Sequence, residues 1–262
     1  MSPELEAVVA GWNVVTAPDR ESWLDARRRY LTASDVAAVL GLHPFKSRAK
    51  VVAEKQAGLA GGDRPWTFES SAMRAGQYLE APVMQWWADD QRMANVRNPD
   101  KYPLRLVSAG VVRGLMGESL LVSHPDPGLR LAASPDGVLL WERGDRFAEL
   151  VEVKVHGPKQ WANWVGAWSP KQVRAAVVLG LEPSAIEEEG EVADWPCPIQ
   201  HWVQLQTQLL CTGVGSGWVV GNCGSERREH HFEADYGFHE RVVAAAREFW
   251  AEVDPGPLDV EL

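Results

Sequence analysis

The chain has 262 residues, of which 24% are charged and 45% are hydrophobic, a composition ordinary for a globular protein with a substantial core. It lacks both the apolar run of roughly 18 residues that a membrane-spanning helix needs and a recognisable secretion signal, so we expect one cytoplasmic domain over residues 1–262. The net charge of −10 argues against indiscriminate binding to nucleic acid, because polyanion binders usually present a basic surface.

The three cysteines indicate neither a disulfide framework nor a metal centre. Cys197, Cys211 and Cys223 are odd in number and widely spaced. A zinc site or an iron–sulfur cluster would need closely spaced or more numerous thiolates. We therefore expect these side chains to be buried or incidental.

The N-terminal part predicts helices that carry a basic cluster. One helix covers residues 21–30 and contains Arg27, and a short one follows with Ser34 at its N-cap position. A third should begin after Ser47 and end at Gln56. A helix N-terminus offers free N–H groups to an anion, and arginine would reinforce that binding. A capped helix beside solvated arginines is the structural alternative.

A longer helix is predicted over residues 70–91. Its apolar residues form a stripe at helical spacing: Met73, Leu79, Val83, Trp86 and Trp87. Glu80 lies among its apolar residues, and Pro82 should disturb the hydrogen bonding nearby. A partly buried carboxylate needs a partner. A metal ion and the side chain of Arg74 would both serve.

The centre of the chain, residues 104–155, has the alternation of β-strands and contains the most informative stretch. Ser134-Pro135-Asp136-Gly137 opens one apolar run, and a polar turn leads to a second that ends in Glu152-Val153-Lys154. Alternation along a strand puts Glu152 and Lys154 on one face, and a hairpin would return Asp136 towards them. Carboxylates suit hard divalent ions, and a lysine beside the ion can orient or deprotonate a water. The alternative is an ordinary hairpin with a surface salt bridge.

The last third predicts a loop-rich insertion over residues 163–198, a helix over 199–212, strands at 217–220 and 229–232, and a closing helix over 238–253. In the first of these helices, His201, Gln204 and Gln208 fall on one face beside an apolar stripe. Polar stripes usually face solvent, but glutamines can also line a substrate cleft.

In order and spacing these motifs resemble the lambda-exonuclease-like (YqaJ-type) phage recombination nucleases of the PD-(D/E)xK superfamily. The resemblance extends from Trp23 to about Val253. It rests on six landmarks: Trp23-x3-Arg27, Thr32-Ala33-Ser34-Asp35, Gly76-x3-Glu80, Ser134-Pro135-Asp136-Gly137, Glu152-Val153-Lys154 and Gln204-Leu205-Gln206. It implies an α/β (α+β) fold, a restriction-endonuclease-like central mixed β-sheet flanked by helices.

The resemblance also implies a role for individual residues. Mg²⁺, with Mn²⁺ as a substitute, would be held by Asp136, Glu152, the Val153 carbonyl and Glu80. Lys154 would position or activate the attacking water, and Gln204 would sit beside the site. Arg27 and Ser34 match the positions that grip a terminal 5′-phosphate.

The activity implied by the resemblance is 5′→3′ digestion of double-stranded DNA from its ends, which leaves 3′ single-stranded overhangs. The enzyme would be a trimer encoded by a phage or prophage, and it would work with a single-strand annealing protein in the bacterial cytoplasm. A site-specific or CRISPR-associated endonuclease and a catalytically silent DNA-end-binding protein are the alternatives.

Two features depart from the pattern or compete with it. His201 stands where the family's late helix often carries an aromatic hydroxyl. Pro125-Asp126 is a second Pro-Asp pair, but proline and glycine follow Asp126 before any strand can form. Asp136 is therefore the preferred candidate ligand.

Overall fold

The computed structural model describes residues 3–17, 19–61, 71–97, 105–111, 120–143, 145–162, 164 and 197–254. The insertion predicted over residues 163–198 lies almost wholly outside these ranges. Within them, no helix combines the length and apolar character needed to cross a membrane.

Four helices lie in the described residues up to position 61: α1 (Pro3–Val9), α2 (Arg20–Arg28), α3 (Ala33–Val39) and α4 (Arg48–Leu59). Ser47 caps α4 as predicted, because its hydroxyl accepts a hydrogen bond from the Lys50 N–H, and the helix runs three residues past the predicted end. The predicted cap at Ser34 is wrong. Thr32 occupies that position, and Ser34 lies in the first turn of α3.

A long helix, α5 (Ser71–Arg97), follows and extends beyond the predicted 70–91 at its C-terminal end. Pro82 lies inside α5 and does not end it. Buried residues on one side of the helix pack against the central sheet: Val83, Met84, Trp87 and Ala88. This packing holds the polar residue Glu80, one turn earlier, at a fixed place along the sheet.

Within the described ranges, the central sheet has five strands. Their order is β2 (Arg105–Val111), β5 (Gly137–Arg143), β6 (Asp145–Val155), β7 (Ser216–Cys223) and β8 (Glu226–Glu233). Strands β6 and β7 pair in parallel, and the other neighbours are antiparallel. A small second sheet has the order β1 (Leu31–Thr32), β4 (Leu131–Ala133), β3 (Val122–Ser123), with the 3₁₀ turn η1 (Pro127–Leu129) before β4. The predicted mixed sheet is therefore confirmed.

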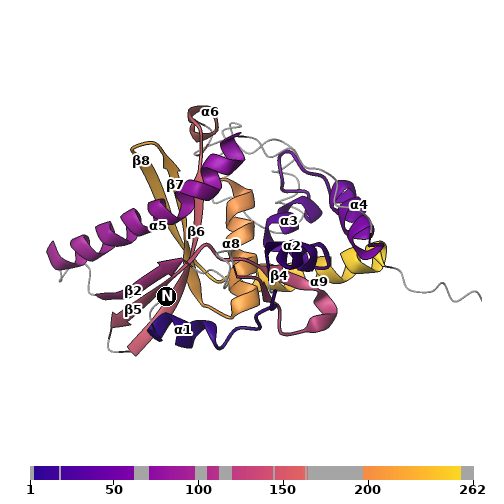
Figure 1. Cartoon of the computed structure of the whole chain (residues 1–262), viewed down its shortest axis with the longest axis horizontal. Helices are drawn as coiled ribbons and strands as arrows, with labels where there is room; N and C mark the ends of the chain where they lie inside the picture. The colour runs from indigo at the N-terminus through magenta and orange to yellow at the C-terminus, as the bar shows by residue number, and fades with distance from the viewer. Residues whose placement is uncertain are drawn as a thin grey trace, which may run out of the picture.

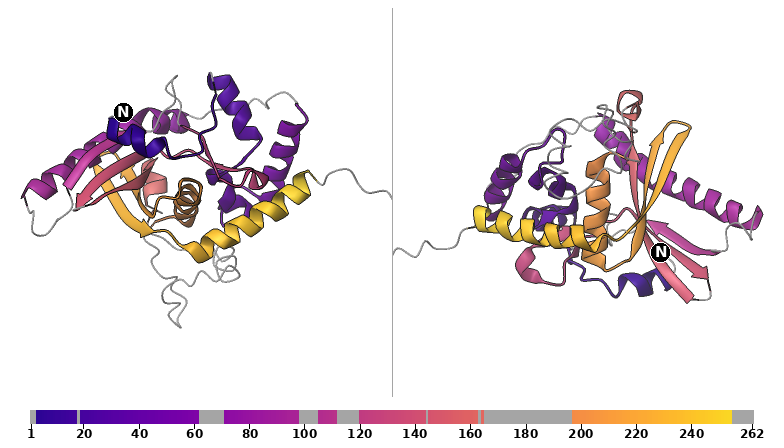
Figure 2. Two further views of the ribbon diagram at one scale, coloured as in Figure 1. Left: turned by 90° about the horizontal axis from the view of Figure 1, so that it is seen from below. Right: turned by 180° about the vertical axis from the view of Figure 1, so that it is seen from behind.

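Helices cover both faces of the central sheet. Helix α5 lies on one face and α8 (Ile199–Thr212) on the other, as the two directions of view in Figures 1 and 2 show. The closing helix α9 (Tyr236–Val253) packs against α8 and α4, and the short α6 (Pro158–Trp161) follows β6. Along β6, Val151 and Val153 join the core under α5, whereas Leu150 joins the core under α8. Alternation therefore places Glu152 and Lys154 on the α8 side.

Candidate active site

The β5–β6 hairpin brings Asp136 and Glu152 together, as the sequence predicts. The two strands pair in regular register from Arg143↔Asp145 to Gly137↔Val151, and one further step places Asp136 opposite Glu152. The Asp136 Oδ2 atom accepts a hydrogen bond of 2.9 Å from the Val153 N–H. The two carboxylates therefore converge where β6 leaves the hairpin.

Glu152 is fully buried, with 0% of its surface exposed. Its Oε1 atom forms an ion pair with Lys154 Nζ, and its Oε2 atom accepts a hydrogen bond from Gln208 Nε2 on α8. Burying a carboxylate is costly unless the protein supplies partners. The surface salt bridge that was the alternative for this hairpin is thereby excluded.

The charges at this site strongly influence one another. Burial raises the pKa of Asp136 well above its usual value, and the nearby Glu152 and Glu80 carboxylates raise it further. Burial acts to lower the pKa of Lys154, but the Glu152 and Asp136 carboxylates outweigh it, so the pKa of Lys154 is raised. In the described part of the chain, the carboxyl groups of Asp136, Glu152 and Glu80 thus all interact with the Lys154 ammonium group.

This donor set fits a hard divalent cation. The acidic groups are oxygen ligands, and the excess of carboxylates over ammonium is what a doubly charged ion would neutralise. Among the residues that the structure describes, no group of three or more Asp, Glu, His or Cys side chains lies in a metal-binding arrangement by itself.

A cleft of about 960 Å³ opens beside these residues. Helix α5 forms one wall with Gly76, Glu80 and Trp86, and the end of β6 contributes Lys154 and His156. Glu80 and Lys154 therefore face a space that a substrate can enter. The buried Glu152 lies behind them.

Gln208 on α8 contacts the site, and the role expected of Gln204 stays a prediction. Gln208 donates to Glu152 and, at 3.4 Å, to the Ser134 carbonyl. Gln204 lies one turn earlier on the same helix face and is partly exposed. The signal for Gln208 was present in the sequence as the third member of the polar stripe, but the resemblance pointed to Gln204.

Two histidines and a tryptophan pack next to Lys154. The His201 ring stacks on Trp164 with centroids 5.8 Å apart, and it lies 5.5 Å from His156. Burial and the positive charge of Lys154 lower the pKa of His156 to about 4 and that of His201 well below its usual value. Both histidines are therefore neutral at physiological pH. His201 has an aromatic packing role in this structure.

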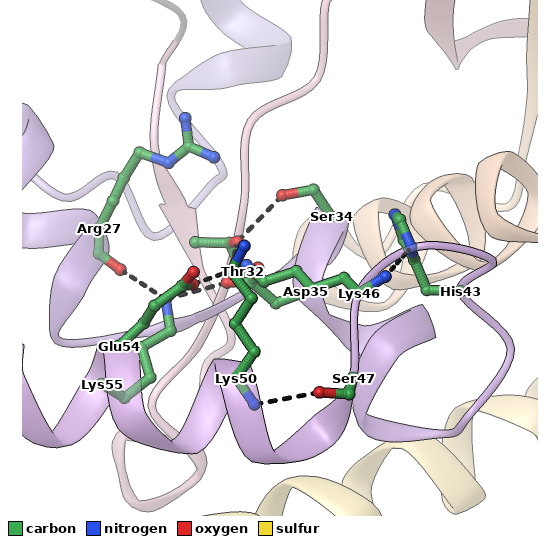
Figure 3. A network of polar contacts seen from close by, with 10 residues as sticks. All are labelled: Arg27, Thr32, Ser34, Asp35, His43, Lys46, Ser47, Lys50, Glu54 and Lys55. Atoms are coloured by element: carbon green, nitrogen blue, oxygen red, sulfur yellow. Dashed lines mark hydrogen bonds and ion pairs between the residues drawn. The ribbon is translucent and has the colours of Figure 1, made fainter. Parts of the chain in front are cut away.

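Arg27 and Ser34 belong to a second polar group, formed by α2, α3 and α4 (Figure 3). Buried Lys55 donates to the Arg27 carbonyl at 3.2 Å and pairs with buried Asp35 at 2.9 Å. Lys46 pairs with the other Asp35 oxygen at 2.8 Å. Burial acts to raise the pKa of Asp35, but the two lysines outweigh it, so the pKa is held well below its usual value.

The Arg27 guanidinium and the exposed Ser34 lie on the same side of this group (Figure 3). The guanidinium stacks over the Trp23 ring, 4.7 Å from its centroid, and the Ser34 hydroxyl lies 3.1 Å from that of Thr32. Helix α3, which carries Ser34, packs against α8, which carries Gln208. One helix pair thus connects this group to the Asp136–Glu152–Lys154 site.

The sequence and the fold have counterparts among known proteins. The family model of the YqaJ-like viral recombinase domain matches residues 22–215. The fold is similar to that of LHK-Exo, an alkaline exonuclease from Laribacter hongkongensis. Its crystal structure alone and its complex with dAMP each align with a TM-score of 0.53 and 22% identity, over 89% of this chain and 92% of the other.

Among proteins with curated descriptions, none matches the chain significantly. The family model nevertheless covers well over half of the sequence, including Arg27, Asp136, Glu152, Lys154 and Gln208. The structure independently brings four of these residues together, Asp136, Glu152, Lys154 and Gln208, and Lys154 lines the cleft. The chain therefore belongs to the YqaJ-like viral recombinase family.

Proposed function

We propose that this protein is a Mg²⁺-dependent exonuclease that digests one strand of duplex DNA from its 5′ end and leaves a 3′ single-stranded overhang. The observation that carries the proposal is the convergence of Asp136, buried Glu152 and Lys154 beside an open cleft. Membership of a viral recombinase family supports DNA as the substrate. The likeness to an alkaline exonuclease supports exonucleolytic cleavage, since the two chains share their fold.

In this proposal the metal ligands are Asp136, Glu152, the Val153 carbonyl and Glu80. When bound, the ion supplies Lewis-acid chemistry, because it lowers the pKa of a water and stabilises negative charge on a phosphate. Gln208 holds Glu152 in place through its hydrogen bond to Oε2. Lys154 extends from the buried carboxylate into the cleft, where its ammonium orients the attacking water and faces the scissile phosphate.

Recognition of the DNA end is assigned to Arg27 and Ser34. A guanidinium offers a planar fork of donors that suits phosphate oxygens, and Ser34 adds an exposed hydroxyl. The Asp35–Lys55 pair fixes the main chain of Arg27 from below. We further propose that the enzyme works as a trimer with a single-strand annealing protein, in keeping with the recombinase family.

The test uses linear duplexes that carry a label at one 5′ or one 3′ end, together with covalently closed circles, in Mg²⁺ or in EDTA. We expect release of mononucleotides from the 5′ end of linear DNA in Mg²⁺ only, with circles left intact. Linearisation of the circles would indicate an endonuclease. Binding of ends without hydrolysis in either condition would indicate a catalytically silent end-binding protein.

A further inference from the structure

Trp86 is a large aromatic residue exposed in the wall of the cleft. It lies on α5 and lines the same cleft as Glu80 and Lys154, yet 41% of its surface is exposed. Burying an indole normally contributes favourably to folding, and the next residue, Trp87, is fully buried. An aromatic side chain left accessible beside a reactive group is therefore a candidate contact for substrate.

The position of Trp86 is fixed by a network on β8. The Arg227 guanidinium lies over the Trp86 ring, 4.8 Å from its centroid. Asp90 and Glu229 hold that guanidinium at 2.7 and 3.5 Å. Glu229 also accepts a hydrogen bond from Trp87 Nε1, which ties α5 to the sheet. The indole is thereby held in the cleft wall before any ligand arrives, which reduces the entropic cost of binding.

We propose that Trp86, backed by Arg227, is a stacking platform for a nucleobase of the DNA strand in the cleft. The inference rests on the proposed nuclease function and adds a base-binding subsite to it. A base fits better than a phosphate, because two carboxylates already neutralise Arg227, whose side chain is only 18% exposed. The residue that remains accessible here is Trp86. Every base has a π-face, so such a contact tolerates any sequence, as an exonuclease that digests DNA of any sequence requires.

The experiment pairs protein variants with DNA that lacks single bases. Duplex ends carry one abasic residue at successive positions of the digested strand, and binding is followed by fluorescence anisotropy in Ca²⁺, used in place of Mg²⁺ to hold back hydrolysis. Trp86→Ala should weaken binding of intact DNA on the order of tenfold, the scale of a lost base–aromatic stack. For wild-type protein, the absence of the base at one particular position should weaken binding by a similar factor. The affinity of Trp86→Ala should not change when that base is absent. Trp86→Phe should keep much of the wild-type sensitivity to its absence.

Met93 provides the matched control. It is 47% exposed on the same helix, two turns beyond Trp86, and does not line the cleft. Met93→Ala should bind intact and abasic DNA as wild type does. Suppose that the wild type cleaves DNA but that no abasic position affects its binding differently from that of Trp86→Ala. This result would overturn the stacking inference and leave the proposed nuclease function intact. The inference would also be overturned if sedimentation showed a changed oligomeric state in Trp86→Ala while its sensitivity to abasic positions stayed the same as that of wild type. If the wild type neither bound nor cleaved duplex ends, both proposals would fall.

Discussion

The side-chain amide of Gln208 donates to the Oε2 atom of Glu152, across a separation of 56 positions in the chain. Lys154 pairs with the other oxygen, so helix α8 and strand β6 together hold the buried carboxylate from two sides. Gln208 also reaches the Ser134 carbonyl, two residues before Asp136. One amide thus contacts both segments that supply Asp136 and Glu152.

Gln208→Met should lower cleavage about 10- to 100-fold and raise the Mg²⁺ concentration needed for half-maximal rate, because groups that orient a metal ligand have effects of that size. The methionine keeps the volume of the buried side chain but leaves Glu152 Oε2 without its donor. Rates measured against Mg²⁺ concentration test this. Gln85→Met on α5, where the exposed amide bonds only Asp89 in the described structure, is the control. Loss of activity in Gln204→Met with none in Gln208→Met would return the role to Gln204.

Arg27→Ala should slow digestion of 5′-phosphorylated ends about tenfold or more, because a charge-assisted contact is worth roughly 1.5–3 kcal/mol. Removing the 5′-phosphate should slow wild type markedly and Arg27→Ala much less. The measurement is a two-by-two comparison of wild type and Arg27→Ala on phosphorylated and hydroxyl ends. Equal sensitivity of both proteins to dephosphorylation would show that another group reads the phosphate. Wild-type indifference to the 5′ end would favour an endonuclease.

The Glu149–His231 contact should make stability depend on pH. The hydrogen bond to Glu149 raises the pKa of His231 above its ordinary 6.5. The contribution of His231 to the free energy of unfolding is therefore complete below about pH 6.5 and is lost as pH rises through the raised pKa. Burial acts to raise the pKa of Glu149, but hydrogen bonds from His231 and Trp218 outweigh it, so the pKa lies below the ordinary 4.5. The contribution of Glu149 is therefore complete above about pH 4.5 and is lost as pH falls through the lowered value.

The cost of His231→Gln in free energy of unfolding should consequently be largest between about pH 4.5 and 6.5 and should shrink by about pH 9. Urea unfolding of both proteins across this range gives the comparison. His230→Gln, at the neighbouring position on β8, should show no such maximum, because burial lowers the pKa of His230. A His231→Gln penalty that stayed constant with pH would contradict the assignment.

Local patterns predicted much of the fold. The helix over residues 199–212 matches α8 at both ends because apolar periodicity, Pro198 and Gly213 bound it. The hairpin prediction placed Asp136 near Glu152 because strand alternation and register follow from the sequence between them. Ser34 was misjudged as a cap because Thr32 lies at the end of β1, whose pairing with β4 is a long-range contact.

The partners of the site residues were not predictable in the same way. Gln208 meets Glu152 only because α8 packs across the sheet, and Lys55 reaches the Arg27 carbonyl only because α4 lies beside α2. The Trp86–Arg227 pair likewise joins α5 to β8. Periodicity identified Trp86 and Trp87 as members of one apolar stripe. It did not show that one is buried and the other faces the cleft.

The most direct measurement compares Asp136→Asn with Asp126→Asn, two identical changes in two Pro-Asp pairs. Asparagine keeps the shape of Asp136 and an oxygen that can accept from the Val153 N–H, but it removes the charge that would bind a divalent ion. Asp126 is exposed and accepts from the Gly128 N–H in the turn before β4. In Mg²⁺, mononucleotide release from 5′-phosphorylated linear duplex should fall by about 10³-fold in Asp136→Asn and stay near wild type in Asp126→Asn. Wild-type cleavage by an Asp136→Asn protein with an unchanged circular dichroism spectrum would contradict the proposed active site.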